Sequence, residues 1–215
     1  MDNKDKDVER QERVQWIYSS KDNKELAERY DEWAKDYDED LDEGFGWVGP
    51  RKAVEYFSKY VPKDARVLDA GAGTGLCGEL LAKEGYNNLV AMDISEGMLE
   101  EARSKGCYRE FHQMVMGESL DYATDSFDAV ISVGVMTVGH APASSLDELV
   151  RVTRPGGYIV YSLRPDVYRE NGFKEKHEEL EKAGKWKLVE VSEEFQTLPK
   201  GEPEVMHQDW IYQVL

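Results

Sequence analysis

The stretch VLDAGAGTGLCGELL, from Val67 to Leu81, decides the fold. It begins as an apolar strand that reaches an aspartate, passes through glycines at every second position, and continues as a helical pattern. Glycine allows backbone angles that other residues resist, and it lets a ligand lie against bare backbone. A ligand at such a turn also meets the free N–H groups of a helix start. We therefore expect a ligand-binding turn here, with a tight turn that binds nothing as the alternative.

The pattern around this stretch alternates between strands and helices. Apolar strands are expected at residues 65–70, 88–93, 108–116, 127–133 and 157–163, and helices between them at 75–84, 95–105 and 143–153. The RPGG sequence at 154–157 is expected to end the last of these helices. A charged helix over 167–183 and two strands, 186–195 and 207–215, complete the chain. This order predicts an α/β, Rossmann-like, seven-stranded and mostly parallel sheet with an antiparallel C-terminal strand and helices on both faces.

Residues 1–50 precede this alternation and differ from it in composition. Two charged helices are expected over 1–20 and 22–37, the second with an aromatic stripe, and an acidic, glycine-rich linker over 38–50. A helix over 50–60 then leads into the sheet, with proline in its first turn. We expect two units: an N-terminal helical lid or extension, residues 1–50, and a catalytic domain, residues 51–215.

Composition narrows the class of protein. The net charge is −17, which disfavours nucleic acid as a partner, because such binding needs a cationic surface. The acidic residues are typical of a solvated face, and steering of a cationic substrate is the alternative. No apolar run approaches a membrane span, the N-terminus does not read as a signal peptide, and Cys77 and Cys107 lack the spacing of a metal site or disulfide framework. We expect a cytoplasmic monomer or homodimer with no metal and no membrane partner.

The spacing of the glycines separates two kinds of cofactor. A dinucleotide fingerprint reads GxGxxG, but Leu76 stands where its third glycine belongs. The observed GxGxG, with an acid two residues earlier, resembles motif I of the class I S-adenosylmethionine-dependent methyltransferases. That resemblance implies that Gly71, Gly73 and Gly75 hold the methionine part of the cofactor. It also implies that Asp69 helps to fix the amino group of the cofactor.

The second strand offers an independent binding group. Asp93 ends the LVAMD strand, 22 residues after Gly71, where a carboxylate can accept hydrogen bonds from both ribose hydroxyls. A helix N-cap is the alternative role, but Ser95 already suits that position. Ile94 is expected to flank the adenine, and Met98 to lie in the core with an adenine contact.

Further landmarks of the same family follow in order. They are the stretch MGESLDYATDSFDAV at 116–130 and the RPGG sequence. The family's usual adenine-binding aspartate would align with Met116, so we expect the backbone of Gly117 and the carboxylate of Glu118 to bind adenine instead. The phrase YDEWAKDYDED at 30–40 also resembles the methyltransferase-like group named for the Williams–Beuren syndrome region. In related enzymes a tyrosine of such a phrase lies by the cofactor, which points to Tyr37 and Trp33, whereas Tyr30 is assigned to packing.

Methyl transfer is an in-line displacement that needs no metal and no covalent intermediate, so placement of the acceptor can supply most of the catalysis. His140 follows the fourth strand, where ligands of open α/β sheets bind, and an imidazole suits general-base work near neutral pH. Arg164 could pair with an acceptor carboxylate, or with one of the nearby acids. His112, His177 and His207 have weaker claims.

The class of acceptor is narrowed mainly by motifs that the sequence lacks. The place of an amino-methyltransferase phrase after the fourth strand reads SVGV, and no Pro-Cys pair for methylation of base carbon is found. A lid over residues 1–50 would favour a small molecule, an amine or a hydroxyl compound. A protein methyltransferase and a cofactor-binding regulatory protein without turnover are the alternatives.

Overall fold

The computed structural model describes residues 3–137 and 139–215, with the side chains of residues 3–7 left aside. Its centre is one sheet with the strand order β3-β2-β1-β4-β5-β8-β6, and a short strand β7 also pairs with β8. The strands are β1 (Val67–Ala70), β2 (Leu89–Asp93), β3 (Glu110–Gln113), β4 (Phe127–Met136), β5 (Thr153–Leu163), β6 (Trp186–Val191), β7 (Phe195–Gln196) and β8 (Met206–Val214).

The pairing confirms the predicted fold class. The neighbours from β3 to β5 are parallel, whereas β8 runs antiparallel to both β5 and β6. The two-residue strand β7 was not predicted, because a pair of residues carries no periodicity. The helices are α1 (Asn3–Tyr18), α2 (Asn23–Glu39), α3 (Gly49–Tyr60), α4 (Leu76–Lys83), α5 (Glu96–Ser104), α6 (Ser145–Val152), α7 (Pro165–Glu170) and α8 (Phe173–Lys182).

Both faces of the sheet are buried, because successive side chains of a strand point to opposite sides. On one face Val67 joins a cluster that includes Phe57 of α3 and Leu81 of α4. On the other face Leu68 joins a cluster that includes Leu149 of α6 and Phe173 of α8. The near-continuous apolar strands of the sequence reflect this burial on both sides.

One sequence-based expectation about the helices is wrong, and one strand begins earlier than expected. The charged helix expected over 167–183 is two helices, α7 and α8, because the chain breaks at Gly172 with a left-handed φ of 79°. Helix α6 ends at Val152, just before the RPGG sequence, as expected, but β5 begins at Thr153 and so includes RPGG instead of following it. There a Cβ on Gly157 would fall 2.5 Å from the carbonyl oxygen of Asp128, so close backbone approach requires glycine.

The expectation of an acidic linker over residues 38–50 is also wrong. This stretch continues α2 as a π-helical segment, η1 (Asp40–Phe45), which ends at Gly46. Leu41 and Phe45 are buried and pack with Ile17 of α1 and Leu26 of α2. The acid and glycine content concealed two core residues, and the N-terminal helices therefore have a small core of their own.

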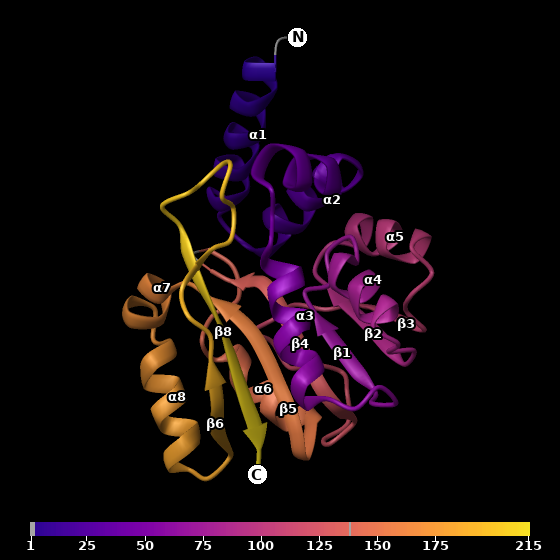
Figure 1. Cartoon of the computed structure of the whole chain (residues 1–215), viewed down its shortest axis with the longest axis vertical. Helices are drawn as coiled ribbons and strands as arrows, with labels where there is room; N and C mark the ends of the chain where they lie inside the picture. The colour runs from indigo at the N-terminus through magenta and orange to yellow at the C-terminus, as the bar shows by residue number, and fades with distance from the viewer. Residues whose placement is uncertain (1–2, 138) are drawn as a thin grey trace.

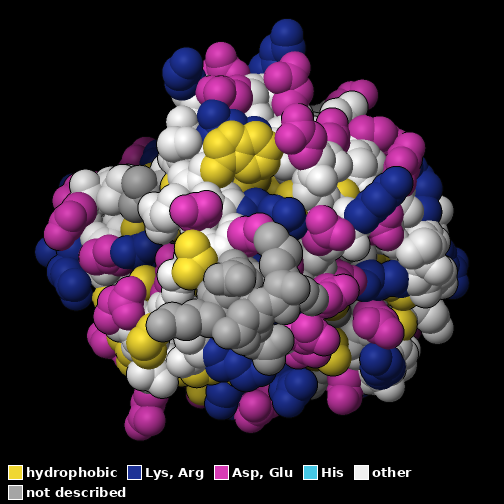
Figure 2. Space-filling model, turned by 90° about the horizontal axis from the view of Figure 1, so that it is seen from above, with side chains coloured by type: hydrophobic (Ala, Val, Ile, Leu, Met, Phe, Trp, Pro, Cys, Tyr) yellow, Lys and Arg dark blue, Asp and Glu magenta, His cyan; other side chains and the backbone are white. Residues whose placement is uncertain are grey.

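The N-terminal helices lie at one end of the sheet. Figure 1 shows α1 and α2 above the ends to which the parallel strands point. Viewed from that side, Figure 2 shows acidic side chains with lysines and arginines among them. Within the described residues, no helix combines the length and apolar content that crossing a membrane would require.

Asp209 of β8 is an unusual member of the core. It is fully buried, its backbone N–H donates to Ser192 Oγ at 2.9 Å, and neither carboxylate oxygen finds a hydrogen-bond partner among the described residues. Burial raises the pKa of Asp209 to about 7, against a lowering influence from Lys52 and a raising one from Glu55. The folded protein therefore holds this proton more tightly than the unfolded chain does.

The sign of that shift gives a stability prediction. The charged form of Asp209 destabilises the fold above pH 7, and the cost disappears as the pH falls toward about 4. We expect Asp209→Asn to raise the free energy of unfolding by about 1–2 kcal/mol near pH 8, with a much smaller gain near pH 5. Urea denaturation at the two pH values measures this, with Asp64→Asn in an exposed turn as the control. An equal effect of Asp209→Asn at both pH values would contradict the assignment.

Candidate functional site

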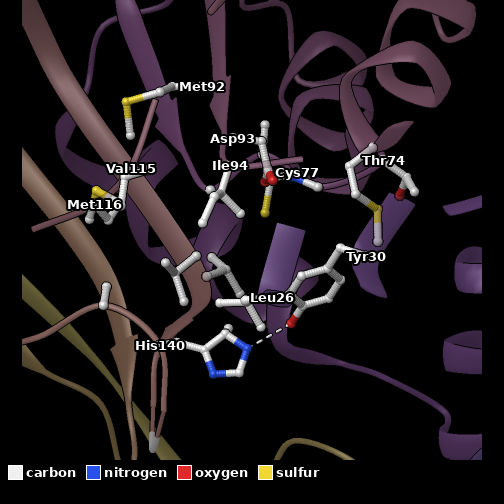
Figure 3. A pocket seen from close by; sticks show the side chains of 18 of the residues that line it. Leu26, Tyr30, Thr74, Cys77, Met92, Asp93, Ile94, Val115, Met116 and His140 are labelled. Carbon is white, nitrogen blue, oxygen red and sulfur yellow. Dashed lines mark hydrogen bonds between the residues drawn. The ribbon is translucent and has the colours of Figure 1, made fainter. Parts of the chain in front are cut away.

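A pocket lies at the carboxyl ends of β1, β2 and β4, beneath α2. It encloses about 830 Å³ of empty space, part of which is open to solvent, and this volume lies within the range of ligand sites. The glycine-rich turn and the ends of the strands form its floor, while α2 and Trp47 close it from the side of the N-terminal helices. Figure 3 shows side chains from both parts converging on the space between them.

The glycine-rich turn forms the floor because its backbone takes left-handed angles. Gly71, Gly73 and Gly75 have φ values of 81°, 54° and 90°. A Cβ on Gly73 would meet nothing within 4 Å, so its backbone faces open space, whereas one on Gly71 would collide with Val135. Gly75 lies at the N-cap of α4 rather than in the pocket wall. The turn therefore offers bare backbone at the start of a helix.

Asp93 ties the second strand to this turn. Its carboxylate accepts hydrogen bonds from the N–H of Gly73 at 2.7 Å and from the N–H of Ser95 at 3.0 Å. Burial raises the pKa of Asp93, and these hydrogen bonds oppose the rise. Ser95 caps α5 by accepting from Met98 N–H, so it is the helix cap, as expected. Asp93 thus stands at the pocket wall with its carboxylate beside the bare backbone.

Asp69 lies behind the wall rather than in it. It is buried, and its carboxylate accepts from the Tyr108 hydroxyl at 2.6 Å. That hydroxyl also accepts from Gly78 N–H at 3.1 Å, so Tyr108 links β1 to α4. Burial raises the pKa of Asp69 to about 7. The sequence analysis missed Tyr108, because its partner is 39 residues away and only the packing of the sheet brings the two together.

Helix α2 supplies the roof of the pocket. Asn23, Leu26, Tyr30 and Tyr37 line the space, and the Tyr30 hydroxyl lies 2.9 Å from Nε2 of His140. Figure 3 shows this pair reaching across the pocket from opposite sides. Burial raises the pKa of both tyrosine hydroxyls, so they stay protonated at neutral pH.

Two carboxylates fasten α2 to the sheet domain. Asp31 Oδ1 accepts from Ser95 Oγ at 2.6 Å and from Gly97 N–H at 2.8 Å, at the start of α5. One heptad later, Asp38 accepts from the Thr74 hydroxyl and pairs with Lys105. Residues seven apart lie on the same face of a helix, so both contacts orient the same side of α2. These contacts were not predicted from the sequence, because acidic residues on a helix normally indicate a solvated face.

Comparison with known proteins agrees with this geometry. Residues 68–161 match a family described as a methyltransferase domain. The chain is 35% identical over 165 residues to methyltransferase-like protein 27 of Homo sapiens, covering 73% of this chain and 66% of that protein. It is 45% identical over 98 residues to a demethylmenaquinone methyltransferase of Clavibacter sepedonicus, covering 44% of this chain and 39% of that protein. The chain belongs to the class I S-adenosylmethionine-dependent methyltransferases.

Solved structures support the fold. A methyltransferase of Haloferax volcanii, in a complex with the Trm112 activator, superposes with a TM-score of 0.65 at 17% identity, over 86% of this chain and 97% of that one. A Thermotoga maritima structure described as a possible histamine N-methyltransferase gives a TM-score of 0.60 at 20% identity, over 86% and 97%. Among the curated relatives named above, the chain spans between 39% and 66% of the full length.

The pocket of this methyltransferase fits the cofactor of the family, S-adenosylmethionine. The open space at Gly73 is a cradle that a Cβ would fill, and it suits the methionine part. The carboxylate of Asp93 suits ribose hydroxyls, and the apolar wall suits a nucleobase. Ile94, Met98 and Met116 contribute to that wall, as does Trp47, which the sequence analysis placed in a linker.

Other predicted site residues lie outside the pocket wall. Gly117 packs by Pro142, Glu118 is exposed, and Trp33 is buried with its Nε1 donating to Asp40 at 2.9 Å. Arg164 donates to both oxygens of Asp166, at 3.0 and 2.6 Å, which is the ion pair considered as the alternative. None of these residues lines the described pocket.

The other histidines lie outside the described pocket wall. His177 is buried between the Tyr161 and Tyr212 hydroxyls, and burial lowers its pKa to about 3. His112 lies beside Glu110, and burial lowers the pKa of His207 to about 4. No described His, Cys, Asp or Glu side chains are grouped in threes to hold a metal ion.

Removal of the Asp93 carboxylate tests its predicted role at the ribose. We expect Asp93→Ala to weaken S-adenosylhomocysteine binding more than about tenfold, or about 1.4 kcal/mol. The variant loses both the ribose acceptor and the support of Gly73 N–H. Isothermal titration calorimetry measures the affinity, with Asp64→Ala in an exposed turn as the control. Unchanged affinity in Asp93→Ala would remove the residue from the ribose site.

Proposed function

We propose that this methyltransferase transfers a methyl group from S-adenosylmethionine to a small-molecule acceptor, an amine or a hydroxyl compound, by in-line displacement. The observation that carries the proposal is the roofed pocket, in which Tyr30 of α2 meets His140 of the sheet domain. A roof held by Asp31 and Asp38 suits a compact acceptor better than an extended protein segment. The reduced thiols Cys77 and Cys107 suit a cytoplasmic protein.

The names of relatives support the same class of acceptor. The demethylmenaquinone methyltransferase, the possible histamine N-methyltransferase and a ubiquinone biosynthesis O-methyltransferase of Xylella fastidiosa are all named for small molecules. The last is 28% identical over 158 residues. From these names we propose only the class of acceptor for this chain. We do not propose any of the named compounds as its substrate.

When bound, the cofactor supplies an electrophilic methyl group on a positively charged sulfur. Gly71, Gly73 and Asp93 would hold it against the floor of the pocket. Tyr37 and Trp47 present aromatic faces, each of which contributes about 1 kcal/mol toward a positive charge. Helix α2 covers the pocket and reduces the access of water to it, and this strengthens the electrostatic interactions inside. Together these residues position and orient the reactants, which is the largest contribution available without covalent chemistry.

His140 acts as the general base, and the Tyr30 hydroxyl relays the proton. The hydroxyl lies 2.9 Å from Nε2 of His140, and both residues line the pocket. In the tautomer whose Nε2 carries no proton, the Tyr30 hydroxyl donates to that nitrogen. An acceptor hydroxyl placed there gives its proton to Tyr30 as Tyr30 gives its own to the imidazole. General-base groups of this kind contribute about 10²–10⁴ in rate.

Incubation with isotopically labelled cofactor and a metabolite extract, followed by mass spectrometry, identifies the acceptor and the methylated atom. A labelled small molecule supports the proposal. Labelled protein would favour a protein methyltransferase. Tight cofactor binding without any labelled product would favour a regulatory protein.

Variants of the pair test the base and its relay. We expect His140→Ala to lower turnover by about 10²-fold or more, and Tyr30→Phe by about 10-fold or more, each with cofactor affinity within about twofold of wild type. His112→Ala on β3 is the control, because His112 lies outside the pocket. Full activity in His140→Ala would make that residue a bystander.

A further inference from the structure

The wall of the pocket carries very little charge. Asp93 is the only Asp or Glu among the described lining residues, and no described lysine or arginine lines the space. The carboxylate of Asp93 already accepts two backbone N–H groups at the floor. The part of the wall around His140 is otherwise apolar or aromatic, with Leu26, Val135 and Ala141 beside it.

From this wall, and resting on the proposed function, we infer that the acceptor is an uncharged aromatic compound that reacts through a phenol-type hydroxyl group.

An acceptor with a carboxylate or phosphate group would find no counterion. Arg164, the candidate from the sequence, lies outside the pocket wall, and its Nε and Nη2 donate to the two carboxylate oxygens of Asp166. Lys105 pairs with Asp38 of α2 and does not line the described pocket. Burying an unpaired anion costs several kcal/mol, which exceeds the favourable free energy of contacts with the apolar wall.

A charged amine is disfavoured for a different reason. An alkylamine and a phenol both titrate near pH 10, so at neutral pH the amine is a cation whereas the phenol is neutral. The reacting atom must come within about 3–3.5 Å of the methyl carbon. Because attack is in line with the carbon–sulfur bond, a second positive charge would lie about 5 Å from the sulfur and be repelled by roughly 3 kcal/mol at an effective dielectric constant of 20. The phenol enters without that cost and gives up its proton only as it reacts.

The aromatic side chains suit a flat ring. Tyr30, Tyr37 and Trp47 line the pocket, and Tyr37 lies edge-on to both of the others with ring centroids 6.3 Å apart. Rings in such arrangements gain about 0.5–1.5 kcal/mol per pair beyond the area they bury. Met114 adds a polarizable sulfur atom to the pocket wall, and such a side chain adapts to ring edges.

Methyl transfer to the hydroxyl oxygen releases one proton, and residues of the pocket can carry it away. The acceptor oxygen forms a bond to the methyl carbon, and the carbon–sulfur bond breaks with its electron pair retained by sulfur. The hydroxyl proton passes to Tyr30, the Tyr30 proton passes to Nε2 of His140, and the imidazole releases it to solvent. The products are an aryl methyl ether, a neutral thioether and one proton.

Three compounds with the same ring system test the inference: naphthol, naphthoic acid and naphthylmethylamine, substituted at the same ring position. Each is titrated by calorimetry into the protein saturated with S-adenosylhomocysteine, at a neutral pH where only naphthol is uncharged. We expect naphthol to bind at least about tenfold more tightly than either charged compound. Equal or tighter binding of a charged compound, or no naphthol binding at about 1 mM, overturns the inference.

A variant with an added cation sharpens the test. Asn23 is an exposed residue at the start of α2 that lines the pocket. Asn23→Lys supplies the missing counterion, so we expect it to improve naphthoic acid binding about fivefold or more and to leave naphthol binding within about twofold. Glu28→Gln changes net charge equally on an exposed residue outside the pocket wall and should change neither.

The two proposals fail in different ways. If S-adenosylhomocysteine itself does not bind, the proposed function falls and this inference falls with it. If it binds but naphthol does not bind more tightly than the charged compounds, the inference alone is overturned.

Discussion

The hydrogen bond from Gly73 N–H to the Asp93 carboxylate is the contact on which the site depends. It joins the turn after β1 to the end of β2, and it holds a left-handed backbone with nothing above it. A side chain at Gly71 would collide with Val135, and one at Gly73 would enter the cradle. The parallel pairing of β1 with β2 brings the two groups together across 20 residues of chain. Without this geometry the pocket would have no floor.

The roof depends on the same elements as the floor. Asp31 contacts the start of α5, the helix that follows Asp93, and Asp38 contacts Thr74 within the glycine-rich turn. Helix α2 is thus oriented by the two segments that would hold the cofactor. This coupling explains why Tyr30 faces His140, and it gives the acidic N-terminal region a structural role beyond solubility.

Features that lie close together in the chain made the fold class and part of the site predictable from the sequence. The strand, the glycine-rich turn and the helix that follows are adjacent in the chain, and so is the acid at the end of β2, so motif and periodicity were enough for the fold class. The roles of Tyr108 and Asp31 depend on partners 39 and 64 or more residues away, which no spacing shows. Trp47 and Phe45 were hidden by acidic and glycine-rich neighbours, and the break at Gly172 by a helical charge pattern.

The predicted placements of Asp69, Trp33 and Arg164 show a related limit. Each residue type was suited to the role, but each side chain meets a protein partner first: Tyr108, Asp40 and Asp166 respectively. A motif says which residues are near a site, whereas packing decides which of their atoms reach it. Tyr30 shows the converse, since a residue assigned to packing has its hydroxyl against the one histidine of the described pocket wall.

A crystal structure of the protein with S-adenosylhomocysteine tests the central claim most directly. The account predicts the nucleoside lying along the backbone at Gly73, with its ribose hydroxyls on Asp93 and its sulfur facing the space between Tyr30 and His140. A ligand bound elsewhere, or a pocket filled by side chains with the cofactor outside α2, would contradict it.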